Sequence, residues 1–386
     1  MQLVLTEDQE LIQKTARDFI DKKSPIKRMR ELRDKQDPVR FSKALWKEMA
    51  ELGWLGIPFP ESLGGSGLGL SELIVVIEAA GRALAPEPFL SSILLGGQSV
   101  LLGGSEEQRK QWLPGVVEGD VFLALAYQEA QSRYSLHRVA TRAEKTGSAA
   151  GGWRISGEKV HVLDGQVADA FVVAARTAGG DDDRDGIGLF LIPAQSAGLT
   201  REAQTRVDSR GAANLVFDGV EVGADAALGE PADGADAAAL LERVVDLATV
   251  GLCGEMLGGM TAALELSTDY LKEREQFGVR IGTFQALKHR AARMFIDVEL
   301  ARSAVMAAAR AVDAEDDEAA KLVSLAKALC SDSYVHVTNE AVQFFGGVGM
   351  TDEYDVGLFM KRARAAELSF GDAAFHRDRW ATLAGY

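Results

Sequence analysis

Apolar residues in the first third of the chain recur at the spacing expected of helices. Ile12, Ala16 and Phe19 follow one another at intervals of four and three positions, and Thr6 stands where a cap for the first helix is needed. Glycine and proline interrupt this pattern at 53–69, which predicts a shaped loop. We therefore expect a helical domain over residues 1–118.

The pattern changes to short apolar runs between residues 120 and 229. The runs at 121–127, 153–156, 170–175 and 188–192 have the composition of strands, and glycine-rich or acidic turns, such as 181–185, separate them. These features predict a β domain over residues 119–230.

Helical periodicity then returns and continues to the end of the chain. Long helical segments are predicted at 236–275, 284–312, 317–345 and 353–380. Their number and length predict a four-helix bundle over residues 231–386. A β module inserted between two helical regions defines an α+β fold and argues against a Rossmann sheet.

The composition limits the function. The chain has 386 residues, of which 47% are hydrophobic and 26% charged, enough for two or three domains with shared cores. No apolar stretch approaches the roughly 20 residues that span a bilayer, and the N-terminus lacks the pattern of a signal peptide. We therefore expect a cytoplasmic protein that does not span a membrane.

The net charge and the positions of the cysteines and histidines indicate which kinds of ligand the protein can bind. The net charge of −15 argues against nucleic acid, so an anionic ligand needs a local basic patch, such as 272–280 or 361–364. Cys253 and Cys330 lie far apart in apolar helical runs, where we expect buried thiols. The histidines show no paired spacing, so a bound organic cofactor fits better than a metal.

The segment 270–289 carries the most informative motif. Arg274, Phe277 and Gly278, followed by Phe284 and Gln285, resemble the R-x-x-F-G and F-Q pattern of the acyl-CoA dehydrogenase family. In that family this segment reaches the FAD of the neighbouring subunit, where the arginine meets the pyrophosphate and the phenylalanine packs near the adenosine. A guanidinium offers paired donors to phosphate oxygens. The alternative is a helix-terminal arginine that neutralises carbonyl dipoles.

A second stretch, 343–351, resembles the family's Q-x-x-G-G-x-G turn, which contacts the same diphosphate. The alternative there is a glycine stop at the end of a helix. Weaker family landmarks follow in the right order at 52–65, 103–114 and 157–159, so the resemblance spans nearly the whole chain. The cofactor-binding residues that it implies are Arg274, Gln276, Phe277, Gln285, Gln343, Gly346 and Gly347.

The resemblance implies a fold, a reaction and partners. The fold has an N-terminal helical domain, a middle β-barrel or sandwich domain and a C-terminal four-helix bundle. The reaction is an FAD-dependent α,β-dehydrogenation of an acyl-CoA thioester, as in lipid or steroid degradation. An electron-transfer flavoprotein or a similar protein accepts the electrons, and the enzyme is a tetramer of identical or paralogous chains.

The family's catalytic carboxylate is missing from both of its known positions. The usual position corresponds to Gly371, and the position on the helix before the arginine motif corresponds to Ala248. Nearby acids could substitute, although none is in register. They are Asp372, one residue late, and Asp246 and Glu242, two and six residues before Ala248.

The flavin side also departs from the family. The family's W-x-T segment corresponds to 161–163, where Leu163 cannot donate a hydrogen bond to flavin N5, and its T-E-P corresponds to 128–130. The leading hypothesis is therefore a subunit that serves a neighbour's FAD and works with a catalytic paralogue. The alternatives are a self-sufficient homotetramer, a flavin oxidase or monooxygenase of the same fold, and a non-catalytic subunit without FAD. The acyl group is not predicted.

Overall fold

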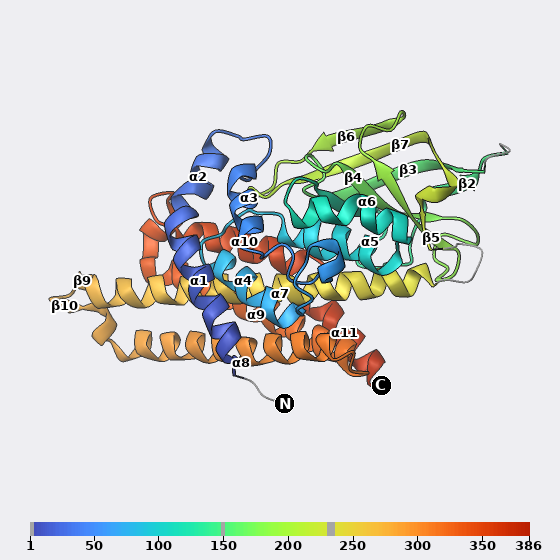
Figure 1. Ribbon diagram of the computed structural model, residues 1–386. Helices are drawn as coiled ribbons and strands as arrows, with labels where there is room; N and C mark the ends of the chain where they lie inside the picture. The colour runs from blue at the N-terminus through green and yellow to red at the C-terminus, as the bar shows by residue number, and fades with distance from the viewer. Residues whose placement is uncertain (1–3, 148–150, 230–235) are drawn as a thin grey trace. The chain divides into compact units, whose positions relative to one another are not determined.

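The computed structural model describes residues 4–147, 151–229 and 236–386. Helices precede and follow a mixed β-sheet in the chain (Figure 1). The chain forms two compact units, and we describe each by itself. One contains Met1–Lys35, Gly69–Pro86 and Thr249–Tyr386, and the other contains Gln36–Leu68 and Glu87–Ala248.

The first unit is helical, and the second half of its longest helix, α7, packs closely against α4. Its helices are α1 (Glu7–Lys23), α2 (Ile26–Asp34), α4 (Leu70–Arg82), most of α7 (Ala237–Glu273), α8 (Gln285–Asp313), α9 (Ala319–Phe345), α10 (Val356–Leu368) and α11 (Ala373–Leu383). The predicted cap is confirmed, because the Thr6 side chain accepts a hydrogen bond from the Gln9 amide. A Cβ added to Gly258 would lie 2.0 Å from the Glu78 carbonyl oxygen, so α7 needs glycine where it touches α4.

The predicted helix 353–380 is wrong in one respect, because it is broken into α10 and α11. Ser369 is extended, and φ is 59° at Phe370 and 110° at Gly371, values that no helix contains. Asp372 then caps α11 by accepting a hydrogen bond from the Phe375 amide at 2.8 Å. The break lies where the resemblance places the family's catalytic carboxylate.

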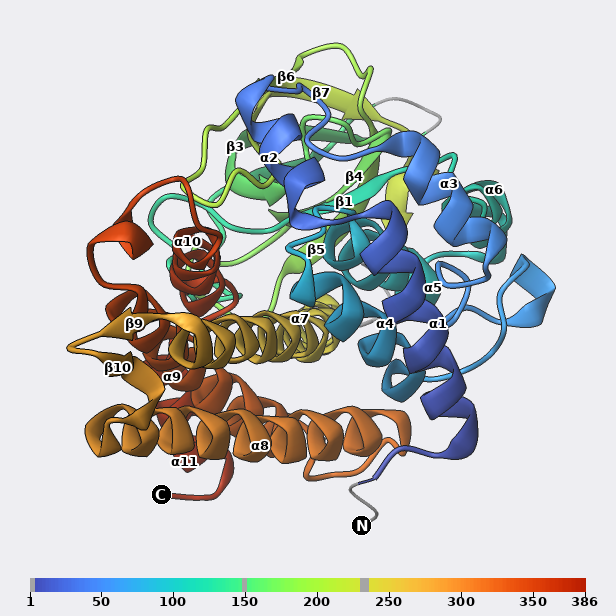
Figure 2. The same ribbon diagram turned by 90° about the vertical axis from the view of Figure 1, so that its left-hand side faces the viewer.

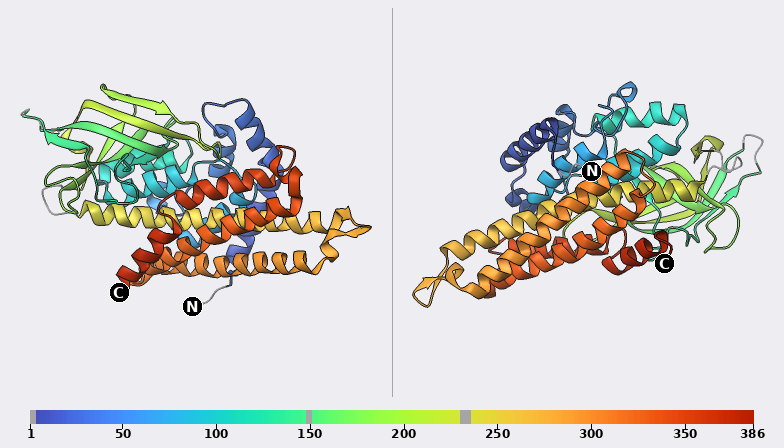
Figure 3. Two further views of the ribbon diagram at one scale, coloured as in Figure 1. Left: turned by 180° about the vertical axis from the view of Figure 1, so that it is seen from behind. Right: turned by 90° about the horizontal axis from the view of Figure 1, so that it is seen from below.

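The second unit is built on one mixed sheet with the order β6-β7-β3-β2-β4-β5-β8, in which β1 also pairs with β4. Figure 3 shows the green strands of this sheet from two further sides. The four predicted runs correspond to β1 (Leu123–Ala126), β3 (Trp153–Leu163), β4 (Ala170–Arg176) and β5 (Ile187–Pro193). The structure adds strands that the named runs did not include: β2 (Arg142–Lys145), β6 (Leu199–Ala203), β7 (Ala212–Val222) and β8 (Ala227–Leu228). The helices of this unit include α3 (Lys43–Glu51), the π-helix Phe89–Gly97, α5 (Gln98–Gly103) and α6 (Glu106–Val117).

Apolar side chains of the strands form the core of this second unit. The larger ones are Trp153, Ile155, Phe171, Phe190, Leu215 and Phe217. Cys253 and Cys330, in the helical unit, are buried free thiols, as expected. Among the described residues, one helix, α7, is long and apolar enough to cross a membrane, and 94% of that apolar window is buried within the protein.

Candidate functional site

A two-stranded hairpin joins α7 to α8 and projects from the helical unit (Figures 1 and 2). Its strands are β9 (Glu275–Gln276) and β10 (Val279–Arg280), and Phe277 and Gly278 form the tip with φ of 58° and 76°. An aromatic residue in this left-handed region costs roughly 1–2 kcal/mol. The Phe277 side chain is nevertheless 89% exposed. The backbone of Phe277 is therefore strained while its ring stays exposed to solvent, so burial of the ring does not compensate for the strain.

The hairpin separates its polar side chains onto two faces. The Ile281 amide donates to the Arg274 carbonyl at 2.9 Å, which extends the ladder by one residue. Side chains alternate along a strand, so Arg274 and Gln276 share one face and Glu275 and Arg280 share the other. Gln285, the first residue of α8, is exposed just after the hairpin.

The hairpin and the start of α8 form a basic region in an acidic protein. Residues 272–293 contain six Lys or Arg and two Glu, a net charge of +4, whereas the whole chain carries −15. Within the described parts of the chain, four of these six cations form no salt bridge: Arg274, Arg280, Lys288 and Arg293. Such a region attracts an anionic ligand.

A glycine turn follows α9. Gly346 has φ of 65° and ends the helix, and the short 3-10 helix Gly346–Met350 continues from it. Gly347 has an ordinary backbone conformation, and a Cβ added to it would meet nothing within 4 Å. Nothing inside the unit therefore requires glycine at 347, and its backbone is open to close approach by an outside molecule. Gln343 is exposed one turn earlier.

The structure brings the hairpin and the glycine turn together at one end of the helical unit. Tyr270, one turn before Arg274, stacks on Phe345, the last residue of α9, with ring centroids 4.1 Å apart. All seven residues that the sequence assigns to the cofactor therefore lie on two adjacent segments.

The turn 369–371 is closed from within the same unit. The buried Lys327 ammonium donates to the carbonyls of Gly371 at 2.7 Å and Glu367 at 3.0 Å, and burial lowers the pKa of Lys327 to about 8. His376 Nε2 lies 3.0 Å from the Phe370 carbonyl, and burial lowers the pKa of His376 to about 3. The turn is thus held by hydrogen bonds from two buried side chains, Lys327 and His376.

We expect that Gly371→Glu neither restores a catalytic base nor leaves the fold intact. A Cβ at Gly371 would lie 2.4 Å from Phe375 Cδ1 and 2.8 Å from His376 Nε2, with φ at +110°. Strain and overpacking together should lower the free energy of unfolding by about 2–3 kcal/mol, measured in urea. Gly53→Glu, at φ of +79° with open space, isolates the conformational cost. Equal losses in the two variants, or gained turnover in Gly371→Glu, would contradict this packing argument.

The three acidic candidates for a substitute base have different surroundings. Asp372 caps α11. Glu242 lies 2.8 Å from His137 Nε2 and 3.5 Å from an Arg184 nitrogen, inside an ion-pair network of the β unit. Asp246 is half-buried on α7. The carboxylates of Asp372 and Glu242 therefore already have structural partners.

The β unit contains a buried ion pair that the sequence did not predict. Lys159 Nζ lies 2.6 Å from Glu129 Oε1, and both side chains are at most 4% exposed. Glu129 also accepts hydrogen bonds from the amides of Ala140 and Thr141 and from the Gln131 side chain. Burial opposes ionisation of Glu129, but the Lys159 charge and these donors hold its pKa at about 2. Both carboxylate oxygens of Glu129 therefore already accept hydrogen bonds from its own loop.

Strand β3 carries a bulge beside this pair. Between Lys159 and Val162 the pairing with β7 gains one extra residue, and His161 has φ of 54°. The bulge leaves His161 exposed and Leu163 half-buried. The segment that corresponds to the family's W-x-T thus presents an imidazole and an alkyl chain.

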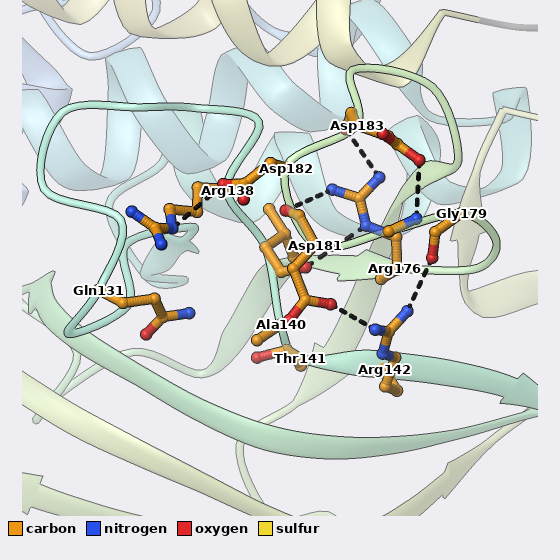
Figure 4. A network of polar contacts seen from close by, with 12 residues as sticks. Gln131, Arg138, Ala140, Thr141, Arg142, Arg176, Gly179, Asp181, Asp182 and Asp183 are labelled. Atoms are coloured by element: carbon orange, nitrogen blue, oxygen red, sulfur yellow. Dashed lines mark hydrogen bonds and ion pairs between the residues drawn. The ribbon is translucent and has the colours of Figure 1, made fainter.

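Arg176, at the end of β4, joins the loop that contains residues 137–139 to the turn 181–185 (Figure 4). Its guanidinium donates to five backbone carbonyls, which belong to His137, Val139, Asp181, Asp183 and Asp185. The acidic turn predicted at 181–185 is therefore wrapped around a buried cation.

Acid should weaken the fold through Glu129. The folded-state pKa of about 2 lies below the ordinary 4.5, so the pair stabilises above pH 4.5 and this contribution is lost as pH falls towards 2. Urea unfolding between pH 6 and 3 measures the slope. Glu129→Gln should be less stable at pH 6 and show a smaller loss on acidification; an identical slope in both proteins would refute the assignment.

The fold and these sites define the class of protein. The sequence matches the family descriptions "Acyl-CoA dehydrogenase, N-terminal domain" at 6–120, "middle domain" at 124–220 and "C-terminal domain" at 239–383. The chain therefore belongs to the acyl-CoA dehydrogenase family, whose members are oxidoreductases acting on CH–CH groups. This confirms the expected family and its fold.

Named relatives extend over most of the chain. Acyl-CoA dehydrogenase FadE12 of Mycobacterium tuberculosis is 32% identical over 87% of this chain and 86% of its own. The ChsE4-ChsE5 complex from Mycobacterium tuberculosis contains a chain that is 30% identical, with a TM-score of 0.88 and full coverage of both chains. A variant of the Tcur3481-Tcur3483 steroid ACAD is 31% identical, with a TM-score of 0.85 over 98% of both chains.

Proposed function

We propose that this chain is the cofactor-completing subunit of a heteromeric, FAD-dependent acyl-CoA dehydrogenase. It supplies the adenosine-diphosphate side of an FAD site to a neighbouring paralogue, which supplies the catalytic base. The observation that carries this proposal is a contrast within one chain. The hairpin and the glycine turn, which the family resemblance assigns to a neighbour's cofactor, are exposed. By contrast, Gly371, which the resemblance places at the base position, sits in a turn with no room for a side chain.

The residues of the two exposed segments fit the diphosphate and adenosine of FAD. Arg274 is a free guanidinium in a region of net charge +4, suited to a diphosphate. Phe277 offers an exposed ring to the adenosine. Gly346 and Gly347 leave backbone open to close approach. Gln276, Gln285 and Gln343 supply amide donors beside them. A flavin bound there would supply the acceptor for the hydride that leaves the substrate β-carbon.

The chain's own β unit fits the isoalloxazine side of a flavin poorly. Leu163 replaces a hydroxyl donor, and the Glu129 carboxylate that follows β1 is fully engaged by its own loop and by Lys159. A subunit of this kind needs a partner that keeps both the hydrogen-bond donor to flavin N5 and the catalytic carboxylate. Asp372, Asp246 and Glu242 would be the bases if the chain worked alone as a homotetramer.

The relatives agree with a paired arrangement. The ChsE4-ChsE5 structure is a complex of two named proteins, and the Tcur3481-Tcur3483 enzyme is a steroid ACAD. We therefore propose lipid or steroid acyl-CoA thioesters as the substrate class, a tetramer of two paralogues in the cytoplasm, and an electron-transfer flavoprotein or similar acceptor. Oxygen consumption instead of transfer to that acceptor would indicate a flavin oxidase.

The visible flavin spectrum tests this proposal. The full chain is purified alone and after co-expression with each acyl-CoA dehydrogenase-like protein encoded nearby. We expect little flavin with the chain alone and a stoichiometric flavin band when a catalytic paralogue co-purifies. A full complement of FAD in the chain alone would favour the self-sufficient homotetramer, and no flavin in any combination would favour a non-catalytic subunit.

A further inference from the structure

The hairpin and the glycine turn are separated by about 70 positions in the chain, yet one set of side chains joins them. Tyr270, Phe345 and Tyr354 form an aromatic cluster, in which Tyr354 meets Phe345 edge-on with centroids 5.0 Å apart and Tyr270 with centroids 6.1 Å apart. Tyr270 precedes Arg274 by one helical turn, and Phe345 directly precedes Gly346. Aromatic contacts of this kind fix relative orientation as well as adding stability.

A second set of contacts fixes the loop that carries Tyr354. Arg33 of α2 holds Asp352 through two parallel hydrogen bonds of 2.7 and 2.6 Å. Arg30, one turn earlier, donates to the Asp352 carbonyl at 2.8 Å and to Asp355 at 2.8 Å. We call Arg30, Arg33, Asp352 and Asp355 the arginine clamp. Bidentate arginine–carboxylate pairs restrict geometry more than single ion pairs do.

The arginine clamp is not explained by the stability of the core. The Asp352 side chain is 59% exposed, and surface ion pairs contribute little to folding. In the clamp, two arginines bind one short segment, residues 351–355, which directly follows the exposed glycine turn. The evident consequence is that the turn has one position relative to the hairpin.

We propose that the aromatic cluster and the arginine clamp are positioning residues for the cofactor-facing surface. They hold Arg274 and the backbone of Gly346 and Gly347 in one arrangement, so that a single diphosphate can contact both segments. None of the five side chains in the core of this device, Tyr270, Phe345, Tyr354, Arg33 and Asp352, is assigned to contact the cofactor. The inference rests on the proposed FAD role of the two segments.

The experiment measures two properties of the full chain in its purified assembly. The first is FAD affinity, obtained by titrating the flavin-stripped protein. The second is hydrogen–deuterium exchange of the peptides covering 274–283 and 343–351. Tyr354→Ala removes one ring of the cluster, and Tyr354→Phe keeps it. Tyr386→Ala is the matched control, because Tyr386 is 92% exposed and stacks only on Trp380 among the ring contacts of the described residues.

Asp352→Asn separates positioning from simple electrostatics. Removing a negative charge near an anion site should tighten FAD binding if charge alone matters. If the clamp positions the turn, losing the bidentate pair should weaken binding instead. We expect about tenfold weaker FAD binding in Tyr354→Ala and in Asp352→Asn, with faster exchange in both peptides, and no change in Tyr354→Phe or Tyr386→Ala.

Two failures are distinguishable. If Arg274→Ala removes FAD while Tyr354→Ala and Asp352→Asn leave affinity and exchange unchanged, the positioning role is wrong and the proposed function stands. If Arg274→Ala retains FAD, the proposed function is wrong. Asp352 is exposed, so its variant tests the inference even if Tyr354→Ala does not fold.

Discussion

Arg274→Ala should remove FAD from the assembly while leaving the chain folded. The guanidinium makes no ion pair within the described residues, so its loss costs the helical unit little. Losing a bidentate, charge-assisted contact to a diphosphate should weaken FAD binding on the order of 10²–10³-fold. The measurement is flavin content after gel filtration, followed by titration of the stripped protein.

A matched control separates this effect from a general change of charge. Arg154→Ala removes an exposed arginine whose partner is Glu221 on the neighbouring strand of the β unit, and it should retain full flavin. Unchanged FAD affinity in Arg274→Ala would instead support an arginine that neutralises the carbonyl dipoles at the end of α7.

Lys159→Met should produce the largest loss of stability. The side chain is fully buried, and its removal leaves the Glu129 carboxylate charged and buried without a cation. Breaking one partner out of a buried pair typically costs 3–5 kcal/mol. Urea unfolding of the full chain at pH 7 measures the change.

Lys110→Met is the control for this prediction. Lys110 forms an exposed pair with Glu106 on α6, and its loss should leave the free energy of unfolding almost unchanged. A small loss in Lys159→Met, similar to the control, would mean that the three other hydrogen bonds to the Glu129 carboxylate keep it ionised without the ammonium.

The helix–strand–helix order could be predicted because the spacing of apolar residues within a short segment already distinguishes a helix from a strand. The sequence also predicted the Thr6 cap, and the family motifs pointed to the hairpin and the glycine turn. Strand β6 was missed because its residues are almost all exposed, so no apolar period marks it. The break at 369–372 depends on a hydrogen bond from Lys327, 44 residues away, and on a left-handed Phe370 that has no turn propensity.

The ion pairs of the site could not be predicted from one sequence either, because they join residues that are distant in the chain. Lys159 and Glu129 are 30 residues apart, and nothing in either local pattern marks them as partners. The family landmark at 157–159 drew attention to Lys159 without giving its role. Likewise, Tyr270, Tyr354 and Asp352 read as ordinary surface residues until the packing of α7, α9 and the loop before α10 places them together.

Turnover by the purified chain tests the central claim most directly. A panel of acyl-CoA thioesters is assayed with an artificial electron acceptor, using the chain alone, its Asp372→Asn, Asp246→Asn and Glu242→Gln variants, and the chain with a catalytic paralogue. We predict no turnover by the chain or its variants, and turnover with the paralogue that Arg274→Ala abolishes. Brisk turnover by the unmodified chain alone, lost about 10²-fold or more in one acidic variant, would identify that residue as the base and contradict the paired-subunit account.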